Sequence, residues 1–482
     1  MRPRTVFLGE VVASQRELVG GKAASLARMR SLGLRVPSAF VVTAEACRSY
    51  FKSGRLDVEL RSEIERAMRR LEEETGRRFG GAERPLLVSV RSGAAVSMPG
   101  MMDTVLAVGM NRDVEGALDR ETGARGFAAE TQARFRELFR RIVLKSPDVP
   151  LPDDPHEQLL LAVAAVFESS RSRRARAYRK HHNLPDDLPT AVTVQVMVFG
   201  NLDERSGTGV LFTRNPSTGE ARPFGEFLPR AQGEEVVSGT RTPEPLDRLA
   251  EILPDVYAEL LAAGSVLEEA ERDVQDVEFT VERGTLWLLQ TRSAKRSADA
   301  AIRIAVELAR EGKIAREEAI GRVTAEQLRA MLRPILRDEA RSGATLLARG
   351  EAASPGIGAG VAVEDCDDAE RRAGNGERVV LVRPTTSPAD VHGMIAAEAI
   401  VTEVGGVTSH AAIVSRSLHK PCVVGCGEGT IVALAGRSVT VDGSNGQVLD
   451  GLLAVEASRS ENPWLAELDA WASGRLFDAL EV

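Results

Sequence analysis

The chain has 482 residues, more than a single hydrophobic core usually supports, so two or three domains are expected. Its apolar (43%) and charged (27%) contents are those of an ordinary globular protein, and a net charge of −8 argues against nucleic acid or a membrane surface as a partner. No apolar run reaches the length of a membrane span, no secretion signal is recognisable, and four cysteines make no disulfide framework, so a reducing cytoplasm is expected.

The elements predicted along the chain change in character three times. Up to about residue 110, short apolar strands alternate with helical stretches, and glycines lie at the junctions. The pattern is then helical and highly charged to about residue 189, after which strands return. A helix is expected over 246–263, and the strands end in a hairpin at 274–292. A charged helical stretch follows, and then a compact segment of strands, glycine turns and one clear helix.

This order predicts an α+β protein of several domains. The expected boundaries are an N-terminal domain over 1–297 with a helical insert at about 111–189, a helical connector over 298–347, a smaller β/α domain over 348–455, and a tail helix over 456–482.

Two glycine-rich segments near the N-terminus are candidates for binding phosphate. "LVGGKAASL" places Lys22 after two glycines and before a helix, where backbone N–H groups and an ammonium can approach an anion, although most such turns carry no ligand. In "VSVRSGAAVSMPGMMDTV", Arg91 is expected to end a strand. Exposed methionines at 98, 101 and 102 in the following loop suit a moving lid.

Two further segments carry hydroxyl or basic groups. "RSGTGVLFTRN" predicts a glycine-rich turn over Ser206–Gly209 ahead of a strand. The basic run from Arg171 to Lys180 can be a phosphate patch, but arginines at helical spacing more often form a solvated face.

The hairpin at 274–292 contains the sharpest signal for a metal. Residues two apart in a strand share a face, so Asp276 and Glu278 point one way. After a turn at Arg283 and Gly284, Gln290 and Arg292 share a face of the returning strand. Two such carboxylates can hold Mg²⁺, and the amide and guanidinium can bind triphosphate oxygens. The alternative is a strand with one solvated face.

His410 lies in "TEVGGVTSHAAIVSR", between a predicted strand and turn and a predicted helix. Thr408 or Ser409 can cap that helix, which places His410 in its first turn. The helix dipole there disfavours imidazolium and stabilises a phosphoryl anion, and two glycines leave room for a polyphosphate. The residues alone leave two readings open, a phosphorylated carrier or a capping-region histidine without chemistry.

These motifs, in this order, resemble the pyruvate, phosphate dikinase family. The resemblance rests on "GGK", "VSVRSGAAVSMPGMMDTV", "SGTGVLFTRNPSTGE", "QGEEVVSGTRTPEP", "QDVEFTVERGTLWLLQTR" and "GGVTSHAAIVSR", and runs to about Gly451. It implies an ATP-grasp nucleotide-binding domain followed by a swivelling phosphohistidine domain, with His410 as the residue that is phosphorylated.

The resemblance also assigns roles to the other candidates. It implies that Asp276 and Glu278 bind Mg²⁺, and that Thr408 is a candidate regulatory site. The residues expected to bind ATP are Lys22, Arg91, Gln290, Arg292 and the glycine-rich segment Gly207, Thr208 and Gly209. In the implied reaction, His410 takes the β-phosphoryl group of Mg-ATP, AMP leaves, and inorganic phosphate takes the γ-phosphoryl group.

Members of this family continue into a C-terminal barrel that binds pyruvate or phosphoenolpyruvate, for which this sequence shows no counterpart. Three explanations are open: a separate barrel chain that docks, a different acceptor such as a small molecule or a glucan, or a non-catalytic ATP-binding regulatory module. The intact candidate carrier His410 argues against the last. The expected partners are ATP, inorganic phosphate, a pyruvate-binding chain and a second copy of this chain.

Overall fold

The computed structural model describes residues 3–11, 15–96, 98, 102–124, 126–146, 148–181, 184–233, 235, 243–331, 334–336, 338–457 and 462–476. The chain divides into two compact units. Unit 1 contains residues 1–207, 229–231 and 279–291, and unit 2 contains residues 208–228, 232–278 and 292–482.

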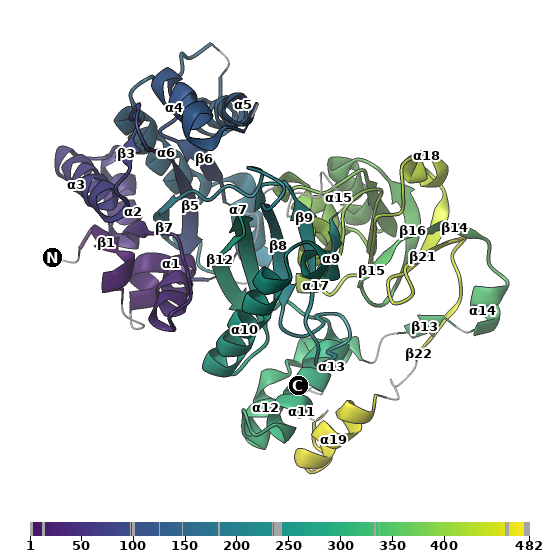
Figure 1. Cartoon of the computed structure of the whole chain (residues 1–482). Coiled ribbons are helices and arrows are strands. Elements are labelled where there is room, and N and C mark those ends of the chain that lie inside the picture. The colour runs from purple at the N-terminus through teal and green to yellow at the C-terminus, as the bar shows by residue number, and fades with distance from the viewer. Residues whose placement is uncertain are drawn as a thin grey trace. The chain divides into compact units, whose positions relative to one another are not determined.

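Unit 1 is built on an antiparallel sheet (Figure 1). Its strands, in spatial order, are β1 (Thr5–Phe7), β2 (Ala39–Val42), β7 (Thr190–Val196), β5 (Val88–Ala94) and β6 (Thr104–Val108). Because successive side chains alternate between faces, Phe40 and Val42 belong to the large core on one face, while Val41 packs with Val19 and Ala23 on the other. Helix α1 therefore covers the second face.

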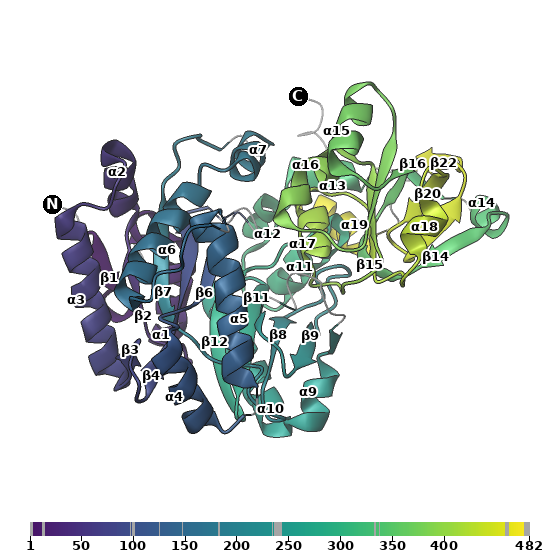
Figure 2. The same cartoon turned by 90° about the horizontal axis from the view of Figure 1, so that it is seen from above.

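Helices between residues 44 and 169 pack against the first face of this sheet to form the large core (Figure 2). In α3 (Val58–Thr75), Asp57 caps the first turn by accepting from the N–H of Leu60 at 2.8 Å, and Gly76 ends the helix in the left-handed conformation. The remaining elements of this unit are η1 (Leu8–Glu10), α1 (Arg16–Ser31), α2 (Ala44–Ser53), α4 (Arg112–Thr122), α5 (Phe127–Phe139), η3 (Arg140–Leu144), α6 (Pro155–Ser169), α7 (Arg173–His181), and the short strands β3 (Arg78–Phe79) and β4 (Pro85–Leu86).

A second sheet has the strand order β10-β9-β8-β11-β12. Its strands are β8 (Gly207–Phe212), β9 (Phe224–Pro229), β10 (Glu244–Pro245), β11 (Gln275–Glu282) and β12 (Thr285–Ser293). The helix expected over 246–263 is two helices, α9 (Asp247–Ile252) and α10 (Pro254–Glu271), because a proline begins the second.

Unit 2 also contains an eight-stranded mixed sheet, in the order β14-β21-β20-β16-β17-β18-β19-β15. Strands β16 (Ile357–Val363), β17 (Val379–Arg383), β18 (Ala399–Thr402) and β19 (Cys422–Val424) are parallel neighbours, and continuous runs of buried aliphatic residues suit their central place. The other strands are β14 (Leu346–Arg349), β15 (Glu351–Ser354), β20 (Ser438–Asp442) and β21 (Gln447–Asp450).

Helices connect and flank these strands. They are α15 (Cys366–Gly374), η4 (Pro388–Asp390), α16 (Val391–Ala396), α17 (His410–Ser417) and α18 (Thr430–Leu434). Because α17 joins the parallel strands β18 and β19, its first residue lies just beyond the carboxyl end of β18, where α/β sheets commonly place ligand sites.

The stretch expected to be a helical connector contains strands as well as helices. Helices α11 (Ala298–Arg310), α12 (Arg316–Arg322) and α13 (Ala325–Ala330) are followed by β13 (Pro334–Leu336) and α14 (Asp338–Ser342). Strand β13 pairs with β22 (Val455–Ala457), and the helix expected in the tail is α19 (Pro463–Trp471). The fold is α+β, as predicted, and none of the described helices is long and apolar enough to span a bilayer.

Candidate functional site

The helix that carries His410 begins as the sequence predicts. Ser409 is the N-cap, with extended backbone angles and a side chain that accepts from the N–H of Ala412 at 3.4 Å, and His410 is the first helical residue. Before it, Gly405 has a φ of +113°, a conformation that a side chain disfavours, and this turns the chain from β18 into the helix. The imidazole therefore lies at the positive end of the α17 dipole.

His410 is buried, with 5% of its surface exposed, and one ring nitrogen is held in place. Nδ1 lies 3.1 Å from Oγ1 of Thr386, which is buried in the loop between β17 and η4. When Nδ1 carries the ring proton and donates it to Thr386, Nε2 holds the lone pair. The contact therefore orients the ring, and in the tautomer in which Nδ1 is the donor, Nε2 is the nucleophile.

The loop before His410 is fastened to a buried carboxylate on β9. Oε2 of Glu226 accepts a hydrogen bond from the N–H of Thr408 at 3.2 Å and a second one from the Thr408 hydroxyl. A Cβ on Gly406 would lie 2.2 Å from Oε1 of Glu226, so a side chain there would force the Glu226 carboxyl group to move. Burial raises the pKa of Glu226 to about 7, although the hydrogen bonds from Thr408 act in the opposite direction.

The predicted hairpin is present, and it buries the carboxylate expected to bind metal. Val277 and Phe279 of β11 point into a core, whereas Asp276 is on the opposite face and only 2% exposed, which excludes the alternative of a solvated face. Arg283 and Gly284, both with positive φ, make the turn, as expected.

The surroundings of Asp276 suit a bound cation. Its Oδ2 accepts from Nε of Arg292 at 2.7 Å, but its Oδ1 is buried and has no hydrogen-bond partner among the described residues. Burial raises the pKa of Asp276, opposed by the charge of Arg292. An oxygen ligand that is buried, acidic and unpaired on one side fits Mg²⁺, for which Asp276 and the half-buried Glu278 supply hard donors.

In unit 1, the structure brings Lys22 and Arg91 to one face of the sheet. Gly20 breaks the helical geometry inside α1 with a φ of +81°, and a Cβ there would lie 1.8 Å from the carbonyl oxygen of Gly93. A Cβ on Gly93 would be 3.5 Å from that of Lys22. Because Arg91 and Gly93 share a face of β5, the glycine contact sets Lys22 over the same face of the sheet as Arg91.

Arg91 also links this face to the returning strand of the hairpin. Its Nη1 donates to Oε1 of Gln195 and to the carbonyl oxygen of Leu289, both at 3.3 Å, and Leu289 precedes Gln290, which is 9% exposed. Lys22, Arg91 and Gln290 all belong to unit 1, whereas Asp276, Glu278, Arg292, Thr408 and His410 belong to unit 2.

Several local expectations were wrong. Gly207, Thr208 and Gly209 are not in a turn but in the buried strand β8, because the chain turns earlier and the backbone at Gly207 packs against Gly200. Arg91 lies within β5, which continues to Ala94.

The exposed methionines expected at 98 and 102 and the solvated basic face also differ from the structure. Met98 is buried and Met102 half-buried, while Met101, like residues 236–242 of the motif "QGEEVVSGTRTPEP", lies outside the described residues. The basic run is not simply a solvated face, because Arg179 is 1% exposed and donates to the carbonyl oxygen of Ser170 at 2.7 Å.

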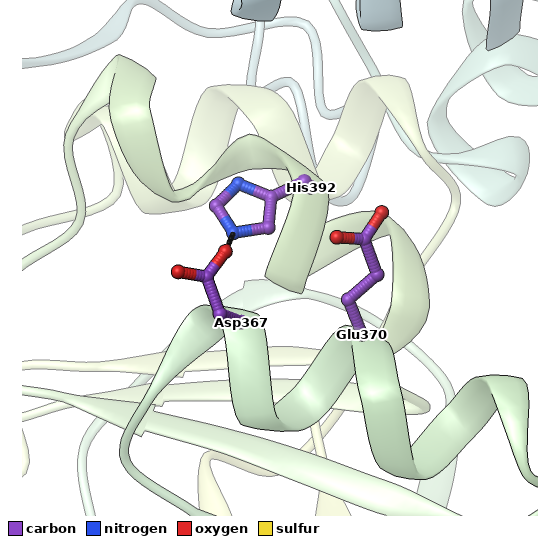
Figure 3. A group of neighbouring side chains, drawn as sticks. All are labelled: Asp367, Glu370 and His392. Atoms are coloured by element: carbon purple, nitrogen blue, oxygen red, sulfur yellow. Dashed lines mark ion pairs between the residues drawn. The ribbon is translucent and has the colours of Figure 1, made fainter.

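Sequence reasoning missed four features near the histidine or on the same unit. Glu226 and Thr386 reach the histidine helix or its loop from distant positions in the sequence, so no local pattern marks them. Arg416 lies on that helix and donates to the carbonyl oxygen of Ala353 on β15. The fourth is the group Asp367, Glu370 and His392 on α15 and α16, whose ligand atoms lie within 4.8 Å of one another (Figure 3). Both carboxylates are exposed, and the 3.1 Å contact between Asp367 and His392 is an ordinary ion pair when the ring is protonated.

Comparison with known proteins agrees with the order of the motifs. The family model described as "Pyruvate phosphate dikinase, AMP/ATP-binding domain" matches residues 16–67 and 52–247, and the model "PEP-utilising enzyme, mobile domain" matches residues 375–446, which include His410.

Curated relatives extend the match over most of the chain. The pyruvate, phosphate dikinase of Clostridium symbiosum is 42% identical over 496 residues, covering 91% of this chain and 57% of the relative. The enzyme of Rhizobium meliloti is 41% identical, and pyruvate, phosphate dikinase 2 of Zea mays is 42% identical, each covering 91% of this chain and 56% of the relative. The chain thus spans little more than half the length of these relatives. It belongs to the pyruvate, phosphate dikinase family.

Proposed function

We propose that this chain is a phosphotransferase that performs the ATP-dependent steps of a pyruvate, phosphate dikinase reaction, with His410 as the phosphoryl carrier. The observation that carries the proposal is the placement of a buried imidazole at the first position of α17, with Nδ1 against Thr386. A nitrogen nucleophile that is neutral near pH 7 and fixed at a helix N-terminus suits transfer of a phosphoryl group.

In the proposed first step, Nε2 of His410 attacks the β-phosphorus of ATP. The bond between that phosphorus and the α,β-bridging oxygen breaks, and AMP leaves with the bond's electron pair. An oxygen of inorganic phosphate then attacks the terminal phosphorus, which releases pyrophosphate and leaves one phosphoryl group on His410. Ser409, as N-cap, and the backbone N–H groups of the first turn of α17 lie where that phosphoryl anion forms.

The nucleotide site is proposed to be an ATP-grasp domain within the expected range 1–297. Lys22 and Arg91, over one face of the sheet in unit 1, would supply positive charge for phosphates, with Gln290 next to the backbone that Arg91 contacts. Arg292, which donates a hydrogen bond to Asp276, is assigned to the same polyphosphate. The β8 segment Gly207–Gly209 is assigned to it as well. When Mg²⁺ is bound, it would neutralise phosphate charge, and Asp276 and Glu278 are the residues that would hold it.

The phosphohistidine domain, proposed to span 348–455, would carry the group to its acceptor. The names of the relatives support pyruvate, with phosphoenolpyruvate as product, and this acceptor stays part of the proposal because the chain spans only part of those proteins. Transfer to another small molecule or a glucan is the alternative. A homodimer, a cytoplasmic location and control by modification of Thr408 also belong to the proposal.

The test is transfer of label from ATP that is radioactive at the β-phosphate. With Mg²⁺ and inorganic phosphate, the wild-type chain should acquire an acid-labile label, whereas His410→Ala should acquire none. His392→Ala is the matched control, because it removes another histidine of unit 2 and should leave the label intact. Label that survives His410→Ala would exclude the carrier role.

Two further readouts separate the alternatives. If AMP release requires inorganic phosphate, the reaction is of the dikinase type, whereas release in its absence indicates that water takes the γ-phosphoryl group. A chain that binds Mg-ATP but never acquires label would be a regulatory module, and the proposed activity would be wrong.

A further inference from the structure

Arg416 is a buried arginine on the same helix as His410, and it uses little of its hydrogen-bonding capacity. Its side chain is 1% exposed, and Nη1 donates to the carbonyl oxygen of Ala353 on β15 at 2.8 Å. Within the described residues, Nε and Nη2 are buried and have no hydrogen-bond partner. A guanidinium carries five donors, so most of its capacity is unsatisfied in a place that excludes water.

Unsatisfied buried charge is costly, and proteins normally avoid it by pairing. Arg214, also in unit 2 and equally buried, donates to Glu268, Glu307 and Glu311. Arg416 forms no ion pair with any residue that the structure describes, and its nearest aromatic partner is the ring of Phe212, 5.9 Å from the guanidinium carbon. A buried cation left in this state indicates a ligand that completes the site.

The charges around Arg416 identify the kind of ligand. Burial lowers the pKa of the Arg416 guanidinium to about 10, opposed first by the charge of Asp276 and more weakly by that of Glu226. Asp276 has its own unsatisfied atom, Oδ1, in the same surroundings. A buried arginine without an ion pair among the described residues, near a carboxylate that is paired with Arg292 through Oδ2 but has no partner for Oδ1, suits one ligand that carries both charges, a polyphosphate with a divalent metal.

We propose that Arg416 is a nucleotide-binding residue that the histidine helix itself contributes. In this inference, which rests on the proposed function, Nε and Nη2 of Arg416 donate to β- or γ-phosphoryl oxygens of ATP while the metal is held at Asp276. Because Arg416 and His410 share α17, the positive charge accompanies the nucleophile. The helix therefore brings both the group that attacks and a group that neutralises the attacked polyphosphate.

The experiment compares ligands with and without β- and γ-phosphates. Binding of Mg²⁺ with the non-hydrolysable analogue β,γ-imido-ATP, and of AMP alone, is measured by calorimetry on the full chain and on Arg416→Met. Losing charged hydrogen bonds should weaken binding of the analogue by about ten- to a hundredfold, while AMP, which lacks these phosphates, should bind as before. Arg416→Lys, which keeps the charge, should recover part of the loss.

The control is Arg372→Met, which removes an arginine of the same unit that pairs with Glu377 at the surface. It should bind both ligands like the wild type. An equal loss for AMP and the analogue in Arg416→Met, or no loss for either, would overturn the inference. A misfolded variant is recognised by its unfolding midpoint, in which case the analogue-to-AMP ratio of Arg416→Lys decides.

The same variants separate this inference from the proposed function. If the wild type acquires β-label on His410 and Arg416→Met does so at the same rate, Arg416 plays no part and the carrier proposal stands. If the wild type acquires no label, the carrier proposal is wrong, and the binding comparison still decides whether Arg416 contacts the polyphosphate.

Discussion

Two buried arginines of the same unit have opposite surroundings. Arg214 on the segment after β8 is enclosed by carboxylates, with Nη2 2.8 Å from Oε1 of Glu268 and 2.6 Å from Oε2 of Glu311. Burial would lower the pKa of Arg214, but these hydrogen bonds raise it above its ordinary value. Among the described residues Arg416 has no carboxylate partner of this kind, and burial lowers its pKa.

The two regions differ in whether their buried charged groups are paired. Around Arg214, every strong charge has an opposite neighbour, and although burial raises the pKa of Glu268, hydrogen bonds from Arg214, Lys313 and Thr213 lower it to about 2. Around α17, the pKa of Glu226 and that of Asp276 are raised by burial instead. The first region has the features of a structural network, and the second those of a site prepared for charged ligands.

The largest effect on stability is expected from a substitution that breaks the ion pairs of Arg214. Arg214→Met leaves Glu268 and its neighbours without their main cation, and removing one partner of a buried pair should lower the free energy of unfolding by about 3–5 kcal/mol. Chemical denaturation measures this loss. Arg372→Met is the control, since its ion pair is exposed and the midpoint should not move. A loss no larger than the control's would show that the network does not stabilise the fold.

The second prediction concerns Glu226 and pH. Its folded pKa of about 7 lies above the ordinary 4.5, so between these values the unfolded chain ionises the group while the folded chain keeps it protonated. The free energy of unfolding should therefore fall as pH rises through this window, by about 3 kcal/mol in all, and level off above it.

Glu226→Gln tests this directly, because the amide does not titrate and still offers Thr408 an oxygen acceptor. Denaturation from pH 4.5 to 7.5 should give a smaller slope for the variant than for the wild type. Parallel slopes would mean that Glu226 is ionised throughout, and that the region around the histidine is better paired than its burial implies.

The sequence predicts the local elements of the site better than the tertiary contacts that join them. The cap at Ser409, the hairpin turn at Arg283 and the shared face of Asp276 and Glu278 depend on residues close in the chain, and the structure agrees with each. Glu226, by contrast, lies far from Thr408 in the sequence, and only the tertiary fold joins them.

One wrong expectation and one missed residue both depend on tertiary packing. A run of glycine and small residues at Gly207–Gly209 is typical of a turn, but here the missing side chains let strands and backbone approach closely. Arg416, at helical spacing on a short helix, carries no sign of its burial in the sequence, since burial depends on β15 and Phe212.

A smaller effect is expected at Thr386. Thr386→Val keeps the shape of the side chain but removes the hydrogen bond with Nδ1 of His410, so the ring loses the contact that orients it. The rate at which β-label reaches His410 should fall about tenfold, as for other partners that orient a histidine. Thr440→Val is the control, because that buried hydroxyl bonds to the carbonyl of Gly451 and not to the histidine. An unchanged rate would mean that the ring needs no support from Thr386.

The smallest effect on stability is expected from Arg416→Met, although the residue is as buried as Arg214. The substitution loses one hydrogen bond, to the carbonyl of Ala353, but it also removes a buried charge with two unsatisfied nitrogens. These terms oppose each other, so the free energy of unfolding should change by less than about 1 kcal/mol in either direction. Denaturation of Arg416→Met beside Arg214→Met measures the contrast. A loss of several kcal/mol in both would make Arg416 a structural residue like Arg214. Near-neutral stability combined with a selective loss of triphosphate affinity is the result that only a ligand-binding arginine gives, because a residue that merely supports the helix cannot affect one ligand without affecting the fold.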